Sequence, residues 1–245
     1  MITDSMTIVW KEFKEMFLQR SGLRGGWLGM IIFVIVFGVF LPLQSGAVWL
    51  ASPATLILWS WVPFILVNGV VADSFAGERE RKTLETLLAS RLSDRAILFG
   101  KLAAAIGYGW GITLVGVILA VVTINVAFGQ GKLLLFPLDI GIAIVVLSFL
   151  VATMSAGLGV LISLRASSVR QAQQTLSVAF LLFFIPLIFF PMLPEAWRQA
   201  VARFLQQLDL SRLLILIGLS LVLIDGLLLF ITYKRFKRPR LVLNS

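Results

Sequence analysis

Apolar residues occur in long blocks separated by shorter polar segments, and this pattern dominates the chain. An α-helix needs about 20 apolar residues to cross the hydrocarbon core of a bilayer, so each block of this length predicts one membrane-spanning helix. The pattern therefore predicts an all-α integral membrane protein with six transmembrane helices, and we treat residues 1–245 as a single transmembrane domain. The six blocks are residues 26–44, 54–72, 102–127, 138–164, 174–193 and 213–233.

Two further segments have the apolar spacing of amphipathic helices rather than of membrane spans. Residues 1–24 are predicted to form an interfacial helix along the inner leaflet, with a frayed basic tail as the alternative. Residues 194–210 are predicted to form an extracellular amphipathic helix between the fifth and sixth spans. The apolar stripes that predict them are Val9, Trp10, Phe13, Met16 and Phe17 in the first and Trp197, Val201, Phe204, Leu205 and Leu208 in the second.

The positive charges of the chain are divided unequally between the two sets of connecting segments. The chain contains 21 Lys and Arg residues, and 17 of them fall on one side of the predicted spans. Because segments rich in Lys and Arg stay in the cytoplasm, both termini and the segment 73–101 are predicted to be cytoplasmic. The expected location is the cytoplasmic (inner) membrane. The four basic residues on the other side are Lys132, Arg198, Arg203 and Arg212.

The composition excludes several classes of catalytic and binding site. The chain is 59% hydrophobic, has a mean hydropathy of +1.00, and contains no Cys and no His. It therefore lacks thiol nucleophiles, Cys/His metal sites and histidine acid–base chemistry. The net charge of +9 is first a topology signal, and the basic residues do not alternate with aromatic ones in a soluble segment, so nucleic-acid binding is not expected.

A dense charged segment, residues 73–101, interrupts this apolar chain between the second and third blocks. No charged residue lies between Arg24 and Asp73, and none lies between Lys101 and Lys132. Within the segment, leucines at helical spacing predict a short helix with one apolar face, and Ser93 with Asp94 predicts the start of a further helix. Either this loop only closes the helix bundle, or a soluble partner binds it. The leucines are Leu84, Leu87, Leu88 and Leu92.

The residues of this loop resemble the cytoplasmic loop of permease subunits of ATP-binding-cassette (ABC) transporters, in the type-2, exporter-like family. Arg91-Leu92-Ser93 stands where that family often has Pro. The resemblance covers most of the chain, because the six spans, the N-terminal helix and the helix before the sixth span also fit. The matching positions in the loop are Phe75, Gly77, Glu78, Glu80, Thr83, Leu84, Glu85, Leu87, Leu88, Ser90, Gly100 and Lys101.

The resemblance implies that this loop holds a coupling helix that contacts a separate ATP-binding-cassette ATPase subunit. It also implies a second permease copy or a homologue, which would complete a dimer in the lipid bilayer. ATP and Mg would bind to the partner subunit, and no catalytic residue, cofactor or metal is expected on this chain. The implied ATPase contacts are Glu78, Arg79, Glu80, Arg81, Thr83, Leu84, Glu85, Leu87 and Leu88.

Three residues inside the predicted spans are candidates for a transport path or gate. They are Asn68, Pro186, which bends a helix by removing a backbone donor, and Asp225. A charge at the centre of a span costs about 2.5–3.5 kcal/mol on insertion scales. Asp225 is therefore expected to face the bundle, either hydrogen-bonded to a neighbouring hydroxyl or in contact with substrate. Small-residue pairs predict close helix packing: Gly107 with Gly111, and Ser155 with Gly159.

The function expected from these observations is the membrane-spanning subunit of an ATP-driven transporter of the exporter type. The near-match to a phosphate-binding loop at Gly129-Gln-Gly131-Lys132 lacks its first Gly and its hydroxyl residue, so ATP hydrolysis is expected on another polypeptide. A non-transporting membrane scaffold that anchors a cytoplasmic partner is an alternative. An integral-membrane lipid enzyme is a weaker one, because such enzymes cluster acidic, His or Cys residues at one membrane depth.

Overall fold

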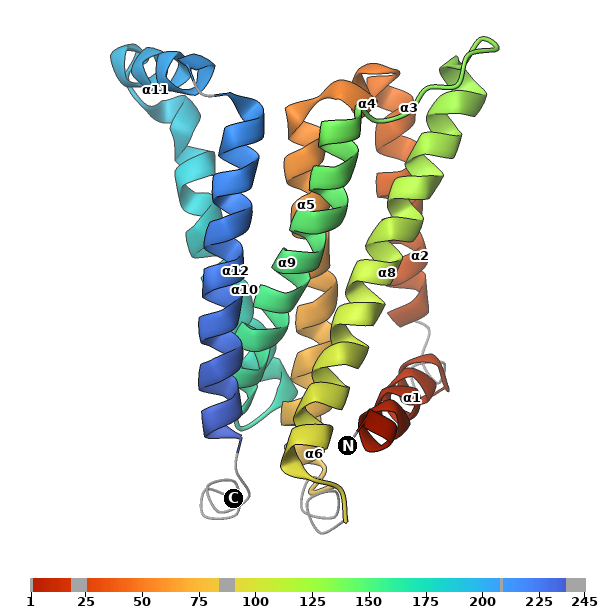
Figure 1. Cartoon of the computed structure of the whole chain (residues 1–245), viewed down its shortest axis with the longest axis vertical. Coiled ribbons are helices and arrows are strands. Elements are labelled where there is room, and N and C mark those ends of the chain that lie inside the picture. Colours follow the sequence, from red (N-terminus) through yellow and green to blue (C-terminus); the bar gives the residue numbers. More distant parts are fainter. Residues whose placement is uncertain (1, 19–25, 84–90, 208, 237–245) are drawn as a thin grey trace.

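The chain is built from helices joined by short turns, as a computed structural model shows (Figure 1). The structure describes residues 2–18, 26–83, 91–207 and 209–236, and these residues include no β-strand. The helices are α1 (Ile2–Leu18), α2 (Gly26–Ile35), η2 (Val36–Phe40), α3 (Leu41–Ser45), α4 (Val48–Ala51), α5 (Pro53–Ala72), η3 (Asp73–Gly77), α6 (Glu78–Glu80), α8 (Asp94–Phe128), α9 (Leu138–Ser163), α10 (Val169–Phe189), η4 (Phe190–Met192), α11 (Glu195–Gln207) and α12 (Leu210–Arg235).

Four of the described helices are long and apolar enough to cross a membrane. They coincide with the second, third, fourth and sixth predicted spans, which confirms an all-helical, multi-pass membrane protein. Helices α2, η2 and α3 cover the first predicted span, and α10 covers most of the fifth. That these two segments cross the membrane stays a prediction. The four helices are Pro53–Glu80, Asp94–Phe128, Leu138–Ser163 and Ser211–Arg235.

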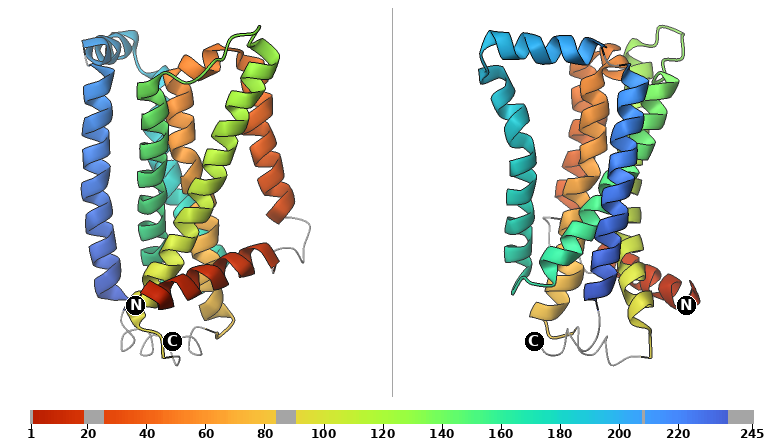
Figure 2. Two further views of the ribbon diagram at one scale, coloured as in Figure 1. Left: turned by 45° about the vertical axis from the view of Figure 1, so that its right-hand side comes forward. Right: turned by 60° about the vertical axis from the view of Figure 1, so that its left-hand side comes forward.

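Helices α5, α8 and α9 form the centre of the molecule, and the remaining helices pack around them. Helix α1 lies across the lower part of α8, while α12 packs against α9, and α10 packs against α9 and α5 (Figure 2). The segments α1, α6 and the C-terminal end of α12 lie at one end of the molecule (Figure 1). These three segments lie together at the end where the sequence predicts the cytoplasmic side. That orientation remains a proposal.

A side-chain cap fixes where the long helix α8 begins. Ser93 accepts a hydrogen bond from the backbone N–H of Ala96 at 3.2 Å, so α8 starts at Asp94, as the Ser93-Asp94 pair predicted. Helix α8 then runs for 35 residues without a break, about 50 Å at 1.5 Å per residue, whereas the bilayer core is about 30 Å thick. Its first two turns therefore extend beyond the apolar block at the end where α1 and α6 lie.

Glycines on α8 and α9 allow the central helices to approach closely. A Cβ atom at Gly109 would lie 2.4 Å from the side chain of Val67, and one at Gly159 would lie 2.8 Å from Val71, so both positions require glycine against α5. The predicted contact at Gly111 is not found, because a Cβ there meets no described atom within 4 Å. Helix α8 packs through glycines on a different face from the one that the G-x-x-x-G spacing indicated.

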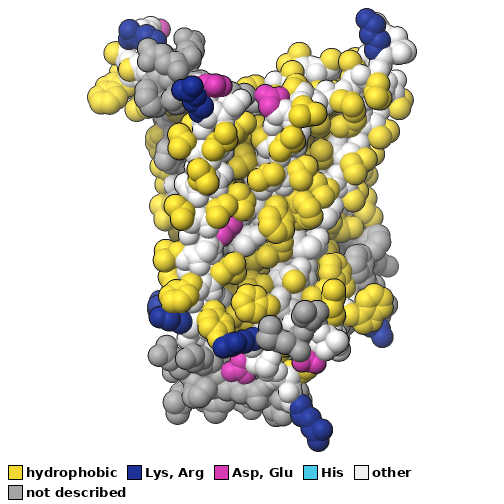
Figure 3. Space-filling model, in the orientation of Figure 1, with side chains coloured by type: hydrophobic (Ala, Val, Ile, Leu, Met, Phe, Trp, Pro, Cys, Tyr) yellow, Lys and Arg dark blue, Asp and Glu magenta, His cyan; other side chains and the backbone are white. Residues whose placement is uncertain are grey.

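Apolar side chains cover the middle of the molecule, while Lys and Arg lie near its two ends (Figure 3). Helix α12 is the most exposed of the candidate spans, with 6% of its apolar window buried, compared with 67% for α9. Such a surface needs lipid or another protein as its surroundings. The fold therefore presents a packed centre and an apolar periphery.

Candidate functional site

The loop between α5 and α8 begins as a direct continuation of α5. The helix passes through the π-helical turn η3 into α6, and it ends where Lys82 adopts a left-handed φ of 57°. Turns of the π type interrupt helices at functional sites more often than elsewhere. The predicted contact residues Leu84, Glu85, Leu87 and Leu88 lie outside the described residues.

A buried cluster of charged residues lies directly behind this loop. The ammonium group of Lys101, on α8, is 2.7 Å from Glu12 Oε1 on α1 and 2.8 Å from Glu78 Oε1 on α6. It also donates to the carbonyl oxygen of Ser74 at 3.0 Å, and the Ser74 hydroxyl donates to Glu12 Oε2. Lys11 closes the cluster at 3.2 Å from Glu78 Oε1. One fully buried Lys thus joins α1, η3, α6 and α8.

Opposite charges in the cluster shift the pKa values of Glu12 and Lys11. Burial by itself would raise the pKa of Glu12, but the adjacent Lys101 ammonium and the Ser74 hydroxyl outweigh it and hold that pKa below its usual range. Burial by itself would lower the pKa of Lys11, and the carboxylates of Glu78, Glu12 and Glu15 outweigh it and raise that pKa. The cluster is therefore a network of opposite charges that hold one another in place.

The position of Glu78 differs from the one expected for a partner contact. Its side chain is 11% exposed and is directed toward Lys101 and Lys11 inside the molecule. Its second oxygen, Oε2, has no hydrogen-bond partner among the described residues. Glu78 therefore connects the loop to the helix bundle, and the surface available to a partner begins beyond it.

The next two predicted contact residues also bind within the chain. Arg79 donates to the carbonyl oxygens of Leu164 and Ala166, at 3.0 and 3.4 Å, in the turn between α9 and α10. Glu80 accepts the backbone N–H of Val169 at 3.1 Å and so caps the start of α10. These contacts attach α6 to the α9–α10 turn.

Arg81 and Thr83 are exposed predicted contact residues, as Glu80 is, and they lie on either side of Lys82 just before the segment 84–90. Arg81 forms an ion pair with Asp73 at 3.0 Å, and its side chain is 60% exposed. Thr83 hydroxyl donates to the carbonyl oxygen of Glu78 at 3.2 Å, which folds the chain back over α6. The charged surface at residues 81–83 thus leads into the segment 84–90.

The candidate path residue Asn68 links two central helices. Its Oδ1 accepts the hydroxyl of Ser155 on α9 at 2.8 Å, and the same hydroxyl donates to the carbonyl oxygen of Phe64 at 3.1 Å. Asn68 also lines a cavity of about 420 Å³ between α5 and α10, together with Gln173 of α10. The close helix packing predicted at Ser155 is confirmed, and Asn68 also faces an open space.

The other two path candidates lie elsewhere. Pro186 is within α10, which continues as a helix to Phe189, and its side chain is outside the described set. Asp225 is buried on α12, and neither carboxylate oxygen has a hydrogen-bond partner among the described residues. The hydroxyl partner that one interpretation expected for Asp225 is therefore absent from this part of the chain, and Asp225 does not line the cavity beside Asn68.

Replacing Asp225 by Leu is expected to stabilise the isolated chain, because it removes a buried polar group that lacks partners. Such groups cost about 1–3 kcal/mol. The measurement is the thermal unfolding of the purified protein, with the surface variant Asp139→Leu as the control. A fall in unfolding temperature on replacing Asp225 would show that the carboxylate has a partner in the native state.

The sequence did not indicate how Lys101 and Glu12 act together. Lys101 is part of the loop motif, but nothing in the sequence links it to Glu12 of the N-terminal helix. In the structure, α1 turns Ile8 and Glu12 toward α8, and Trp10 is 74% exposed. Lys101 directly precedes a block without charged residues. Because a buried ammonium group requires an acidic partner, this position could have indicated one.

Comparison with known proteins gives two findings. The family model described as ABC-2 family transporter protein matches residues 62–236, which include α6, α8 and α12. The ABC transporter permease protein NatB of Bacillus subtilis (strain 168) is 28% identical over 150 residues, covering 56% of this chain. The matched region is 38% of the length of NatB, so this chain spans well under half of that relative.

Proposed function

The chain belongs to the ABC-2 family of transporter proteins as a permease subunit, and from this premise we propose that it couples ATP hydrolysis on a separate ATPase subunit to export. ATP and Mg would bind to that subunit, and this chain would supply the docking loop and half of the translocation pathway. The cytoplasmic (inner) membrane is the proposed location, with α1, α6 and the end of α12 on the cytoplasmic side.

The observation that carries the proposal is the attachment of the loop to the rest of the molecule. Glu78 is tied through Lys101 to α8 and α1, and Arg79 and Glu80 are tied to the α9–α10 turn. Rigid elements joined by such contacts move together, and packed interfaces switch between discrete arrangements. A displacement of the loop by an ATPase would therefore reach α8, α9 and α10 simultaneously.

The exposed apolar helices support a second permease copy as a partner. Helix α10 and helix α12 carry many large apolar side chains on the surface of the isolated chain. Lipid can cover such faces, and so can a second copy, which would complete a pathway between two sets of spans. Exposed side chains of this kind include Val178, Leu181 and Leu182 on α10 and Leu219, Leu223 and Leu227 on α12.

Removing the exposed charges at the end of the described loop is expected to weaken ATPase binding about tenfold. Arg81→Ala with Lys82→Ala deletes two exposed cations next to the predicted coupling helix, each worth up to about 1 kcal/mol at a surface. The measurement is co-purification of the chain with its ATP-binding-cassette ATPase partner, and the ATPase activity of the complex.

The matched control is Lys132→Ala with Arg198→Ala, which removes two exposed cations at the opposite end of the molecule. This control is expected to bind normally. Equal binding by both double variants would contradict docking at the loop. A complex that assembles, but whose ATPase activity is indifferent to every transported compound, would instead favour a membrane scaffold.

A further inference from the structure

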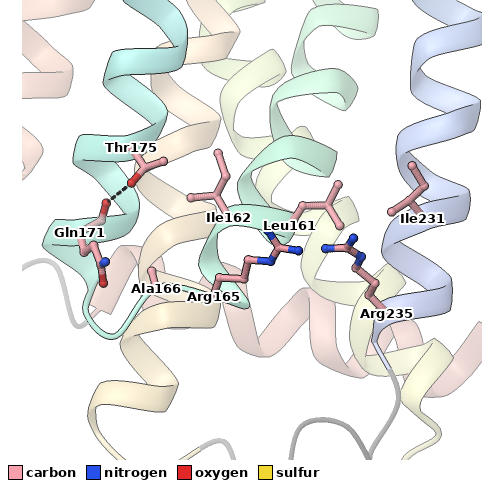
Figure 4. Close-up of a pocket in the computed structure, with 8 residues that line it drawn as sticks. All are labelled: Leu161, Ile162, Arg165, Ala166, Gln171, Thr175, Ile231 and Arg235. Atoms are coloured by element: carbon pink, nitrogen blue, oxygen red, sulfur yellow. Dashed lines mark hydrogen bonds between the residues drawn. The ribbon is translucent and has the colours of Figure 1, made fainter. Parts of the chain in front are cut away.

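A second cavity, separate from the loop cluster, opens between α9, α10 and α12. Its volume is about 430 Å³, and it lies at the end of the molecule where α6 and the C-terminal end of α12 are found. Apolar side chains from α9 and α12 form much of its wall, and two arginines face it from different segments (Figure 4). The lining residues are Leu161, Ile162, Arg165, Ala166, Gln171, Thr175, Ile231 and Arg235.

The two guanidinium groups point toward one another across this cavity (Figure 4). Arg165 follows the end of α9, and Arg235 is the last residue of α12. Among the described residues, no carboxylate forms an ion pair with either of them. Both arginines are exposed at the cavity, and an anion bound between two like charges would reduce their repulsion.

The backbone around Arg165 is held by a contact to α6, and the Arg165 side chain faces the cavity (Figure 4). Arg79 binds the carbonyl oxygens of Leu164 and Ala166, on either side of Arg165. Arg165 is therefore fixed at its backbone while its guanidinium is left for the cavity. An arginine that merely extended to the membrane surface would need neither this anchor nor a second arginine facing it.

We propose that this cavity binds the phosphate of an anionic phospholipid headgroup between Arg165 and Arg235. Arginine presents paired donors that match phosphate oxygens, and basic pockets between membrane helices on the cytoplasmic side bind anionic headgroups. The apolar wall favours a lipid over a soluble anion, because Leu161, Ile162 and Ile231 can contact the first part of an acyl chain. The cavity is lined by residues outside the ATPase docking loop.

The test is lipid binding to the purified full chain, followed by native mass spectrometry with phosphatidylglycerol and, separately, phosphatidylcholine. Phosphatidylglycerol is expected to bind more tightly than phosphatidylcholine. Arg165→Gln with Arg235→Gln should weaken phosphatidylglycerol binding about thirtyfold, from about a fivefold effect for each charge near an anionic lipid. Arg170→Gln with Lys234→Gln removes two exposed charges from the same region but outside the cavity, and it should leave binding within about twofold.

A second variant keeps the test decisive if the double arginine variant does not fold. Ile231→Trp fills the cavity while it preserves both charges, and it should also weaken phosphatidylglycerol binding. Unchanged binding in this variant, or equal losses in the two charge variants, would overturn the site because surface charge alone would then explain binding. Full competition by millimolar inorganic phosphate would overturn the lipid assignment in favour of a soluble anion.

Discussion

Replacing Lys101 by Met is expected to destabilise the chain more than any other single change that removes a charge. The side chain of Lys101 is fully buried, and its removal leaves the buried carboxylates of Glu12 and Glu78 close together, with the partly exposed Lys11 as their remaining counter-charge. Breaking a buried ion pair from one side costs about 3–5 kcal/mol. Helix α1 should detach from α8, and the start of the loop should lose its connection to the bundle.

The measurement is the thermal unfolding of the purified variant together with its yield as a monodisperse protein. Lys132→Met removes an exposed lysine and should have little effect. Adding Glu12→Gln and Glu78→Gln to Lys101→Met should recover most of the lost stability, because no buried charge is then left alone. A Lys101→Met protein as stable as the native chain would show that the cluster does not hold these helices together.

Replacing Gly100 by Leu is expected to displace α1 while it leaves the central bundle intact. A Cβ atom at Gly100 would lie 2.8 Å from Ile8 Cβ and 3.1 Å from the carbonyl oxygen of Ser5, so α1 packs directly on this glycine. Leucine has a higher helix propensity than glycine by about 1 kcal/mol, so α8 itself is not weakened. The loop would then transmit its movement to α8 without α1, and ATPase activity should respond less to transported compounds.

Cysteine labelling can measure this displacement, because the chain contains no native Cys. Ile8 is 3% exposed, so Ile8→Cys should be protected in the native background and become reactive when combined with Gly100→Leu. Gly111→Leu places the same side chain on the same helix where nothing lies within 4 Å, and Ile8→Cys should stay protected there. Equal labelling in the two backgrounds would argue against α1 as a packed part of the coupling apparatus.

The helices of this fold were predictable because length and apolar composition alone determine which segments can cross a bilayer. The block 138–164 became α9 at Leu138–Ser163, and the block 54–72 became α5 at Pro53–Ala72. Helix boundaries differ from those of the apolar blocks where polar residues continue a helix beyond the block. Helix α8 starts at Asp94, as the Ser93-Asp94 pair predicted, so it begins about two turns before the apolar block 102–127.

The site was predictable only in part, because a sequence period shows which residues share a face and not what that face contacts. The loop motif located Glu78 and Lys101, but it did not show that they contact each other or that Lys101 contacts Glu12. Arg79 and Glu80 were predicted as ATPase contacts, and the sequence did not show that they bind the α9–α10 turn. The glycine spacing on α8 likewise indicated Gly111, whereas the close approach of α5 is at Gly109.

The central claim is that a separate ATPase docks on the loop between α5 and α8, and cross-linking from single cysteines tests it most directly. Lys82→Cys marks the exposed end of the described loop, and Lys132→Cys marks the turn at the opposite end of the molecule. In membranes that contain the assembled complex, a short thiol-to-amine cross-linker should capture the ATPase subunit from Lys82→Cys and not from Lys132→Cys. Capture from Lys132→Cys alone, or from neither position in an active complex, would contradict the account.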